Sequence, residues 1–261
     1  MEAVQHTVDS KTLNLNQNTY IPSEVLYEND KFYMRYAHSL QEIEEIEDYL
    51  AQSQCFDPVC KFFGIGAEDL QHIMFTNIRE MSFQKNYRVF VIEKETQRKC
   101  SSFVIMDYND QISPPQDSPT NYQLFFKQMA YPQQEALKVC PEFFQPEIFQ
   151  GRVRLISVFP EFRGKGILQF VFEGFEAIAK ARNYEYLHMV MTTPESQHYG
   201  NKRQGYKILG KTYYGEQDEI KEAFKPHEES MARWRDGDRP FVQYGIYQVS
   251  EQKRLEKQDN N

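Results

Sequence analysis

The feature that most constrains the fold is a strand pattern that leads through a glycine-containing turn into an apolar helix pattern. Residues 152 to 159, RVRLISVF, carry apolar or β-branched side chains at 153, 155, 156 and 158, which favours a strand. The turn follows in FPEFRGKGIL, residues 159 to 168, which contains Gly164 and Gly166. Beyond it, apolar residues recur at helical spacing to about Arg182: Leu168, Val171, Phe172, Phe175, Ile178 and Ala179.

This order of elements predicts a phosphate-binding turn. The first amides of a helix lack intrahelical acceptors, and the helix dipole adds partial positive charge at the same end. The surrounding residues form a basic island, in which only Glu161 opposes four cations: Arg152, Arg154, Arg163 and Lys165. The run matches neither GxGxxG nor GxxxxGK[ST]. An ordinary turn that uses glycine for backbone freedom is therefore the alternative for this segment.

Patterns elsewhere predict a single mixed α/β domain. Strands are expected at 31–37, in a hairpin of 86–94 with 100–108, at 184–192 and at 241–249. Helices are expected at 40–52, where Ser39 is a suitable cap, at 68–81 and at 124–138. The proline-rich segment 109–123 predicts a loop, and 196–216 predicts a short helix and a strand. Strands thus alternate with helices over most of the chain, without an internal repeat.

Composition and charge exclude several classes of function. A net charge of −8 disfavours general nucleic-acid binding, which needs a basic face, and is compatible with a cationic substrate. The four cysteines form no CxxC pair and the histidines no HxxxH pair, so we expect reduced thiols and no metal site. No apolar run has the length of a membrane span, and the start lacks the apolar centre of a secretory signal. A cytoplasmic protein without membrane association is expected.

The two ends of the chain are predicted to be polar tails. Residues 1–26 and 250–261 are polar and lack periodicity, so the ordered domain is expected to comprise 27–249. A protein partner that holds these polar tails is also considered.

Three segments resemble the GCN5-related N-acetyltransferase (GNAT) superfamily. In LISVFPEFRGKGILQFVFEGFEAIAKARNYEYLHM, Arg163 and Gly166 follow a strand with the spacing of the superfamily's acetyl-CoA motif. GYKILGKTYY is similar to its late Gly-aromatic element. CFDPVCKFFGIGAEDL is similar to the early helix of the arylalkylamine and insect dopamine N-acetyltransferase branch, with Asp57-Pro58 in place of Glu-Pro. The matches cover residues 30 to 248 loosely and are most specific at 155–167.

The resemblance implies a GNAT fold, α/β (α+β), with a single mixed, mostly antiparallel, twisted sheet flanked by helices. It also implies direct acetyl transfer from acetyl-CoA, without a metal, to a primary amine such as a small arylalkylamine. Pantetheine would lie along Leu155 to Val158, where the strand edge is splayed from its neighbour, and an amide of Ser157 or Val158 would stabilise the thioester oxygen. The implied cofactor-binding residues are Ser157, Val158, Arg163, Gly164, Lys165, Gly166 and Ile167.

Three side chains are implied as catalytic groups. An alkylamine has a pKa near 10, like Lys, and must lose a proton before it attacks. Asp57 is the implied base and would act through water, because Asp is one methylene shorter than Glu. Its alternative role is that of a cap or turn residue before Pro58. Tyr199 or Ser196 would supply a weak acid to the departing thiolate.

Leu168 departs from the motif, which has Gly or Ala at this position. A leucine that crowds the pyrophosphate would leave a catalytically inactive GNAT-fold protein, acting as a structural subunit of a large assembly. A side chain directed into the core, like others of its stripe, would instead leave the amides free. A third hypothesis, acetylation of a protein lysine or N-terminus, predicts an open groove instead of a tunnel.

Overall fold

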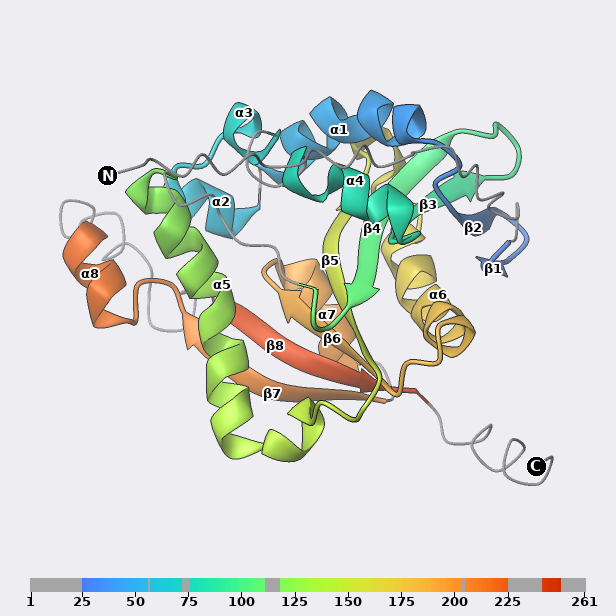
Figure 1. The fold of residues 1–261 in the computed structure, drawn as a ribbon. Helices are drawn as coiled ribbons and strands as arrows, with labels where there is room; N and C mark the ends of the chain where they lie inside the picture. The colour runs from blue at the N-terminus through green and yellow to red at the C-terminus, as the bar shows by residue number, and fades with distance from the viewer. Residues whose placement is uncertain are drawn as a thin grey trace, which may run out of the picture.

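The structure, a computed structural model, describes residues 25–55, 57–71, 76–110, 118–202, 205–224 and 241–249. Its strands form one eight-stranded sheet in the order β1-β2-β3-β4-β5-β6-β8-β7 (Figure 1). The strands are β1 (Tyr27–Glu28), β2 (Phe32–Tyr36), β3 (Arg88–Glu93), β4 (Lys99–Asp107), β5 (Gln150–Val158), β6 (Tyr186–Met191), β7 (Tyr206–Tyr213) and β8 (Phe241–Gln248). Neighbouring strands are antiparallel except β5 and β6, which are parallel.

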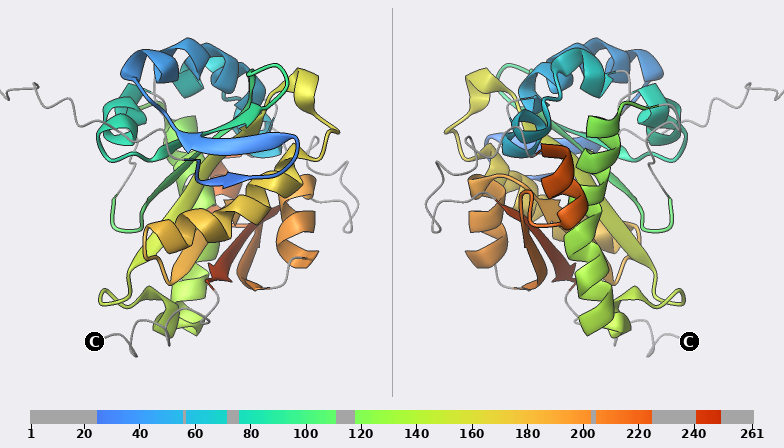
Figure 2. Two further views of the ribbon diagram at one scale, coloured as in Figure 1. Left: turned by 90° about the vertical axis from the view of Figure 1, so that its right-hand side faces the viewer. Right: turned by 90° about the vertical axis from the view of Figure 1, so that its left-hand side faces the viewer.

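Helices cover both faces of this sheet. The two views of Figure 2 face opposite sides of the molecule, with α6 in front in one and α5 in front in the other. The helices are α1 (Leu40–Gln54), α2 (Pro58–Phe63), α3 (Ala67–Leu70), α4 (Thr76–Gln84), α5 (Thr120–Val139), α6 (Ile167–Ala181), α7 (Pro194–Lys202) and α8 (Asp218–Phe224). The single mixed, mostly antiparallel sheet flanked by helices is therefore confirmed.

Local sequence explains the two helices that frame the site. In α1, the Ser39 side chain accepts a hydrogen bond from the Glu42 amide at 3.1 Å, and Ile43, Ile46 and Leu50 are buried. The predicted cap at Ser39 and the predicted apolar stripe of this helix are therefore both confirmed. In α6 the apolar stripe packs into the core, and its buried residues are Ile167, Phe170, Val171, Phe172, Phe175, Ile178 and Ala179. The hydrophobic face fixes the N-terminus of α6 beside the end of β5.

One expected segment differs from the structure and one is described only in part. Of the helix expected at 68–81, the structure describes 68–71 and 76–81, and these residues are helical, in α3 with the following Gln71 and in α4. The loop expected over 109–123 ends earlier, because α5 begins at Thr120. The carbonyl of Pro119 accepts from the amides of Tyr122 and Gln123, so this proline starts the helix instead of extending the loop. The other expected strands and helices are confirmed, and β6 lies between β5 and β8.

The predicted tails fall almost entirely outside the described residues. Only Val25 and Leu26 of the N-terminal segment are described, and the Leu26 amide donates to the Met34 carbonyl at 2.8 Å. The domain limits, and the partner considered for the tails, stay predictions. Among the described residues, no helix has the length and apolar character needed to cross a membrane.

Candidate active site

The turn between β5 and α6 presents a row of free amides. Gly164 and Gly166 have φ of 76° and 79°, a left-handed conformation that favours glycine. The first helical bond runs from the Phe170 amide to the Gly166 carbonyl at 3.1 Å. Over the described residues, the amides from 164 to 169 have no hydrogen-bond acceptor. The predicted anion-binding geometry, several unpaired N–H groups at the positive end of a helix, is therefore present.

β5 carries an extra residue in the middle of its ladder with β4. Ser102 pairs with Ser157 and Val104 with Arg154, so one residue of β4, Phe103, lies opposite two of β5, Leu155 and Ile156. Leu155, inside this interval, has a positive φ of 54°. The combination is a β-bulge, which bends the strand and redirects the groups after it.

Beyond the bulge, β5 and β6 separate. Their pairing runs only from Gln150↔Tyr186 to Val153↔Met189, while β6 remains paired with β8 as far as Met191. This open edge is the splay that the resemblance implied. Because sequence alone cannot place the bulge, the splay could not be derived from strand patterns.

Main-chain groups of β5 face the open edge. The Phe159 amide donates to the Cys100 carbonyl at 3.0 Å and Val158 pairs with Ser101, so the groups of Val158 point away from β4. The Val158 carbonyl accepts from Arg163 Nε at 3.4 Å, on the opposite side from β4. The Val158 amide thus points toward the space between β5 and β6, as needed for an oxyanion donor. Ser157 is buried, and its hydroxyl has no partner within the described part of the chain.

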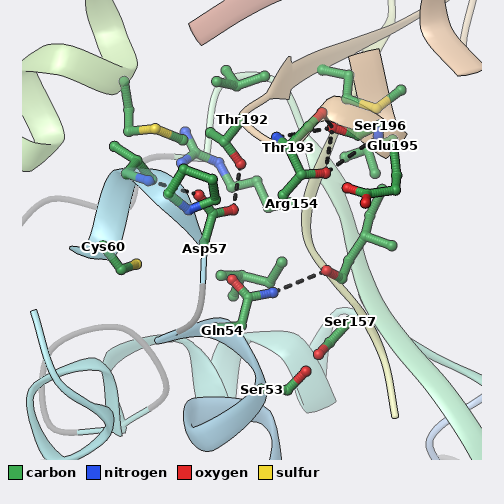
Figure 3. Close-up of a pocket in the computed structure, with 18 of the residues that line it drawn as sticks. Ser53, Gln54, Asp57, Cys60, Arg154, Ser157, Thr192, Thr193, Glu195 and Ser196 are labelled. Atoms are coloured by element: carbon green, nitrogen blue, oxygen red, sulfur yellow. Dashed lines mark hydrogen bonds between the residues drawn. The ribbon is translucent and has the colours of Figure 1, made fainter. Parts of the chain in front are cut away.

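One cavity of about 1490 Å³ connects the turn with the α5 side of the sheet. Its walls come from the turn at Gly164 and Gly166, from β5, from α2 and from α5. Figure 3 shows Asp57, Thr192, Arg154 and Ser157 around this space. The volume exceeds that of ordinary single-ligand pockets, about 300–1,000 Å³. A single continuous space can therefore hold two molecules whose reacting ends meet at the splay.

Asp57 begins α2 and faces the cavity. Its Oδ1 accepts from the Val59 amide at 3.0 Å, so it caps the helix, and its Oδ2 accepts from the Thr192 hydroxyl. Burial raises the pKa of Asp57, although hydrogen bonds from Thr192 and from the Val59 amide act in the opposite direction. The capping role and a position on the cavity wall therefore coexist. A carboxylate with a raised pKa is a better proton acceptor than a free one.

Ser196 and Tyr199 both line the cavity from α7, but their hydroxyls differ in use. The Ser196 hydroxyl donates to the Thr193 carbonyl at 2.9 Å and accepts from Thr193 Oγ1 at 3.1 Å. These hydrogen bonds stabilise the N-terminus of α7. No hydrogen bond joins the Tyr199 hydroxyl to another described residue, and the centre of its ring lies 5.7 Å from that of Phe172. Of the two hydroxyls, only that of Tyr199 does not already donate a hydrogen bond to another described residue.

The cations of the turn differ in position. Arg163 donates to Ser53 Oγ at 3.2 Å and to the end of β5, and it lines the cavity. Lys165 is exposed, with its ammonium 4.6 Å from the centre of the Phe162 ring. Arg163 is thus held against the site and Lys165 contributes charge at its border.

Leu168 forms part of the cavity wall. It is partly buried and packs against the hydrophobic core. Ile167, beside it, is 1% exposed. Because the amides at Leu168 and Ile167 remain without acceptors in the described chain, the leucine does not consume the anion-binding groups.

Sequence reasoning missed the position of Arg152 and Arg154. They were grouped with Arg163 and Lys165, but they lie before the bulge, where Arg152 stacks on Tyr108 at 4.4 Å. Both line the cavity away from the turn. Their spacing on a strand, with Val153 between them, already placed both on one face. Within the described residues, no group of three or more His, Cys, Asp or Glu side chains could hold a metal ion.

Comparisons with known proteins identify this architecture. No protein-family model matches the chain, and no functionally curated protein matches it. Its splayed sheet and amide-lined turn define the GNAT fold, and solved structures agree. Arylalkylamine N-acetyltransferase 7 of the yellow fever mosquito Aedes aegypti is similar at 13% identity and TM-score 0.66, over 90% of this chain and 98% of that one. Arylalkylamine N-acetyltransferase 2 of Aedes aegypti is similar at 16% identity and TM-score 0.61, over 85% and 100%.

A third similar structure is the C-terminal condensation domain of Ebony in complex with β-alanyl-dopamine, at 14% identity and TM-score 0.63, over 82% of this chain and 98% of that one. The chain therefore has the GNAT fold. The predicted likeness to the arylalkylamine branch is also found among the solved structures. At these identities the comparison concerns the fold, so activity and substrates are argued from the site.

Proposed function

We propose that the protein is an acetyl-CoA-dependent N-acetyltransferase that transfers the acetyl group directly to a primary amine, a small arylalkylamine or similar. The observation that carries this proposal is the row of unpaired amides from 164 to 169, which opens into the same cavity as the splayed edge of β5. Several main-chain donors at a helix N-terminus fit a diphosphate. Main-chain groups of β5 along the splayed edge can form hydrogen bonds with the amide groups of pantetheine.

Residues of this chain would hold acetyl-CoA through main-chain and charged groups. The amides of Gly164, Lys165, Gly166 and Ile167 bind the diphosphate, and Arg163 adds charge beside them. Bound acetyl-CoA supplies an activated thioester. The Val158 amide, directed into the open edge, would donate to the thioester oxygen as it gains negative charge.

The acceptor amine would approach from the α2 and α5 side. Asp57 takes its proton, directly or through one water, because its carboxylate lines the cavity and its pKa is raised by burial. Tyr199 would donate a proton to the departing thiolate, because its hydroxyl is free of other partners in the described chain. Ser196 remains a second donor on the same helix. Walls from α2 and α5 around this half of the cavity favour a small amine over a protein side chain.

Titration with acetyl-CoA tests the proposal through the melting temperature. At about 100 times the Kd, binding adds about 2.7 kcal/mol of stability, or about 5–11 °C for a chain of this size. The variant Gly166→Glu places a carboxylate beside the diphosphate. Like charges about 4 Å apart repel by about 4 kcal/mol at an effective dielectric constant of about 20, which lowers affinity about a thousandfold.

Gly64→Glu is the matched control, because Gly64 also has a positive φ, of 64°, and open space at its Cβ position. It carries the same strain and the same charge outside the cavity lining. Stabilisation of wild type and Gly64→Glu, but not of Gly166→Glu, is expected. Absence of stabilisation in the wild type refutes the proposal and favours the second hypothesis, an inactive GNAT-fold structural subunit.

A further inference from the structure

Two arginines on β5 line the cavity and have no counter-charge among the described residues. Arg152 and Arg154 are two residues apart on one strand, so their side chains leave the same face. Both line the cavity, and Arg152 is only 6% exposed. The Nε atoms of both are buried without a hydrogen-bond partner, and neither guanidinium has an ion pair with any described residue.

The described groups that contact this arginine pair carry no negative charge. Arg152 stacks on the Tyr108 ring at 4.4 Å, a contact that attracts a cation without neutralising it. Burial, and then the charge of Arg152, lower the pKa of Arg154 to about 9. His188 is fully buried nearby and hydrogen-bonded to Gln150 and Tyr244, all uncharged groups. Buried charges are normally paired, so an unpaired cation on a cavity wall indicates an anionic ligand.

The acidic side chains that line the cavity form no ion pair with Arg152 or Arg154 among the described residues. Asp57 Oδ1 and Oδ2 accept from the Val59 amide and from Thr192, and no oxygen of Asp57 lies within 4.0 Å of a guanidinium nitrogen of Arg154. Glu219 pairs with Lys127, and Glu195, an exposed residue of the same lining, forms no ion pair with either arginine among the described residues. Asp57, at the start of α2, and the arginine pair, on β5, thus line the same cavity; Figure 3 labels Asp57 and Arg154.

We propose that Arg154, with Arg152 behind it, binds a carboxylate of the acceptor, so that the acceptor is an amino acid or another amine that carries a carboxylate. The guanidinium of Arg154 is planar and presents paired N–H donors that match a carboxylate. The amine of the same molecule faces Asp57. This inference deepens the proposed function and rests on it. It excludes polyamines as preferred acceptors, because a second cation would face Arg154.

The test compares acceptors that differ only by the carboxylate: tyrosine with tyramine, and arginine with agmatine. With saturating acetyl-CoA, we expect kcat/KM of the wild type to favour the carboxylated member of each pair by about 10- to 100-fold, the size of a charge-assisted contact. Arg154→Leu should abolish this preference, because it should lower kcat/KM for the carboxylated member of each pair more than for the amine. Arg154→Gln provides a polar replacement if leucine impairs folding, and Lys138→Gln, on the exposed end of α5, is the control for loss of one positive charge.

A binding arm separates failure of this inference from failure of the proposed function. N-acetyltyrosine should raise the melting temperature more than N-acetyltyramine in the wild type, but not in Arg154→Leu, and this readout requires neither acetyl-CoA nor turnover. Acetylation of both members of each pair with equal kcat/KM overturns the inference and retains the acetyltransferase. If succinyl-CoA replaces acetyl-CoA with an advantage that needs Arg154, the carboxylate belongs to the acyl donor, and assignment to the acceptor is wrong.

Discussion

The buried imidazole of His188 predicts a specific loss of stability in mild acid. His188 Nε2 lies 2.6 Å from Gln150 Oε1, and Nδ1 contacts the Tyr244 hydroxyl. The neutral tautomer that fits donates from Nε2 to Gln150 and accepts at Nδ1 from Tyr244. Burial, and then the charge of Arg152, lower the pKa of His188 from 6.5 to about 3. The fold therefore requires the uncharged form.

The pKa shift fixes the sign and size of the effect. A group whose folded pKa is depressed contributes its full stability above its unfolded pKa, here 6.5, and loses it as pH falls toward about 3. At about 1.36 kcal/mol per pKa unit, the whole contribution is about 5 kcal/mol. Between pH 7 and pH 5 only the unfolded chain takes up this proton, so the loss is about 2 kcal/mol.

Urea unfolding at pH 7, 6 and 5 measures this loss in wild type and in His188→Gln. The amide of glutamine supplies one donor and one acceptor but does not titrate, so its baseline cost cancels when pH values are compared. The wild type should lose about 2 kcal/mol more than the variant between pH 7 and 5. His198→Gln, at an exposed position, should follow the wild type. Equal losses in wild type and His188→Gln would refute the argument that the imidazole is held neutral.

Two further substitutions examine the catalytic and packing arguments. Asp57→Asn keeps an acceptor for the Val59 amide but removes the base. We therefore expect kcat/KM to fall by about 100-fold or more, while acetyl-CoA still stabilises the protein. Unchanged turnover would contradict the assignment of Asp57 as the base. Gly210→Ala would place a Cβ 2.2 Å from the Pro132 carbonyl oxygen of α5. The helix must then move, and unfolding in urea should show a loss of about 1–3 kcal/mol; wild-type stability would mean that α5 and β7 are not in this close contact.

Strongly periodic segments could be predicted from sequence because their own residues determine them. The apolar stripe of α6 and the turn at Gly164 and Gly166 are examples, and the structure places both as expected. The continuity of the helix expected at 68–81 stays a prediction, because residues 72–75 lie outside the described part of the chain. The helical role of Pro119 was missed because proline is common both in loops and at helix starts.

The parts of the site that depend on contacts between residues far apart in the sequence could not be predicted from any single segment. Asp57 was singled out by its likeness to a family helix, but its partner Thr192 lies 135 residues away. The alternation of Arg152, Val153 and Arg154 assigned the arginines to one face, yet only the placement of α5 shows which side of the sheet that face covers. Propensity describes neighbours in sequence, whereas these contacts depend on which strands pair and in what register.

The bulge at Leu155 divides β5 into two parts that can diverge independently. Side chains before it, at Arg152 and Arg154, line the wall on the α5 side, whereas main-chain groups after it, at Val158, meet the open edge. Substitutions before the bulge alter side-chain chemistry and leave the later peptide groups in place. Under the proposed function, substitutions at Arg152 and Arg154 would change which amine is accepted without changing how acetyl-CoA is bound, whereas deletion of one residue at the bulge would alter both.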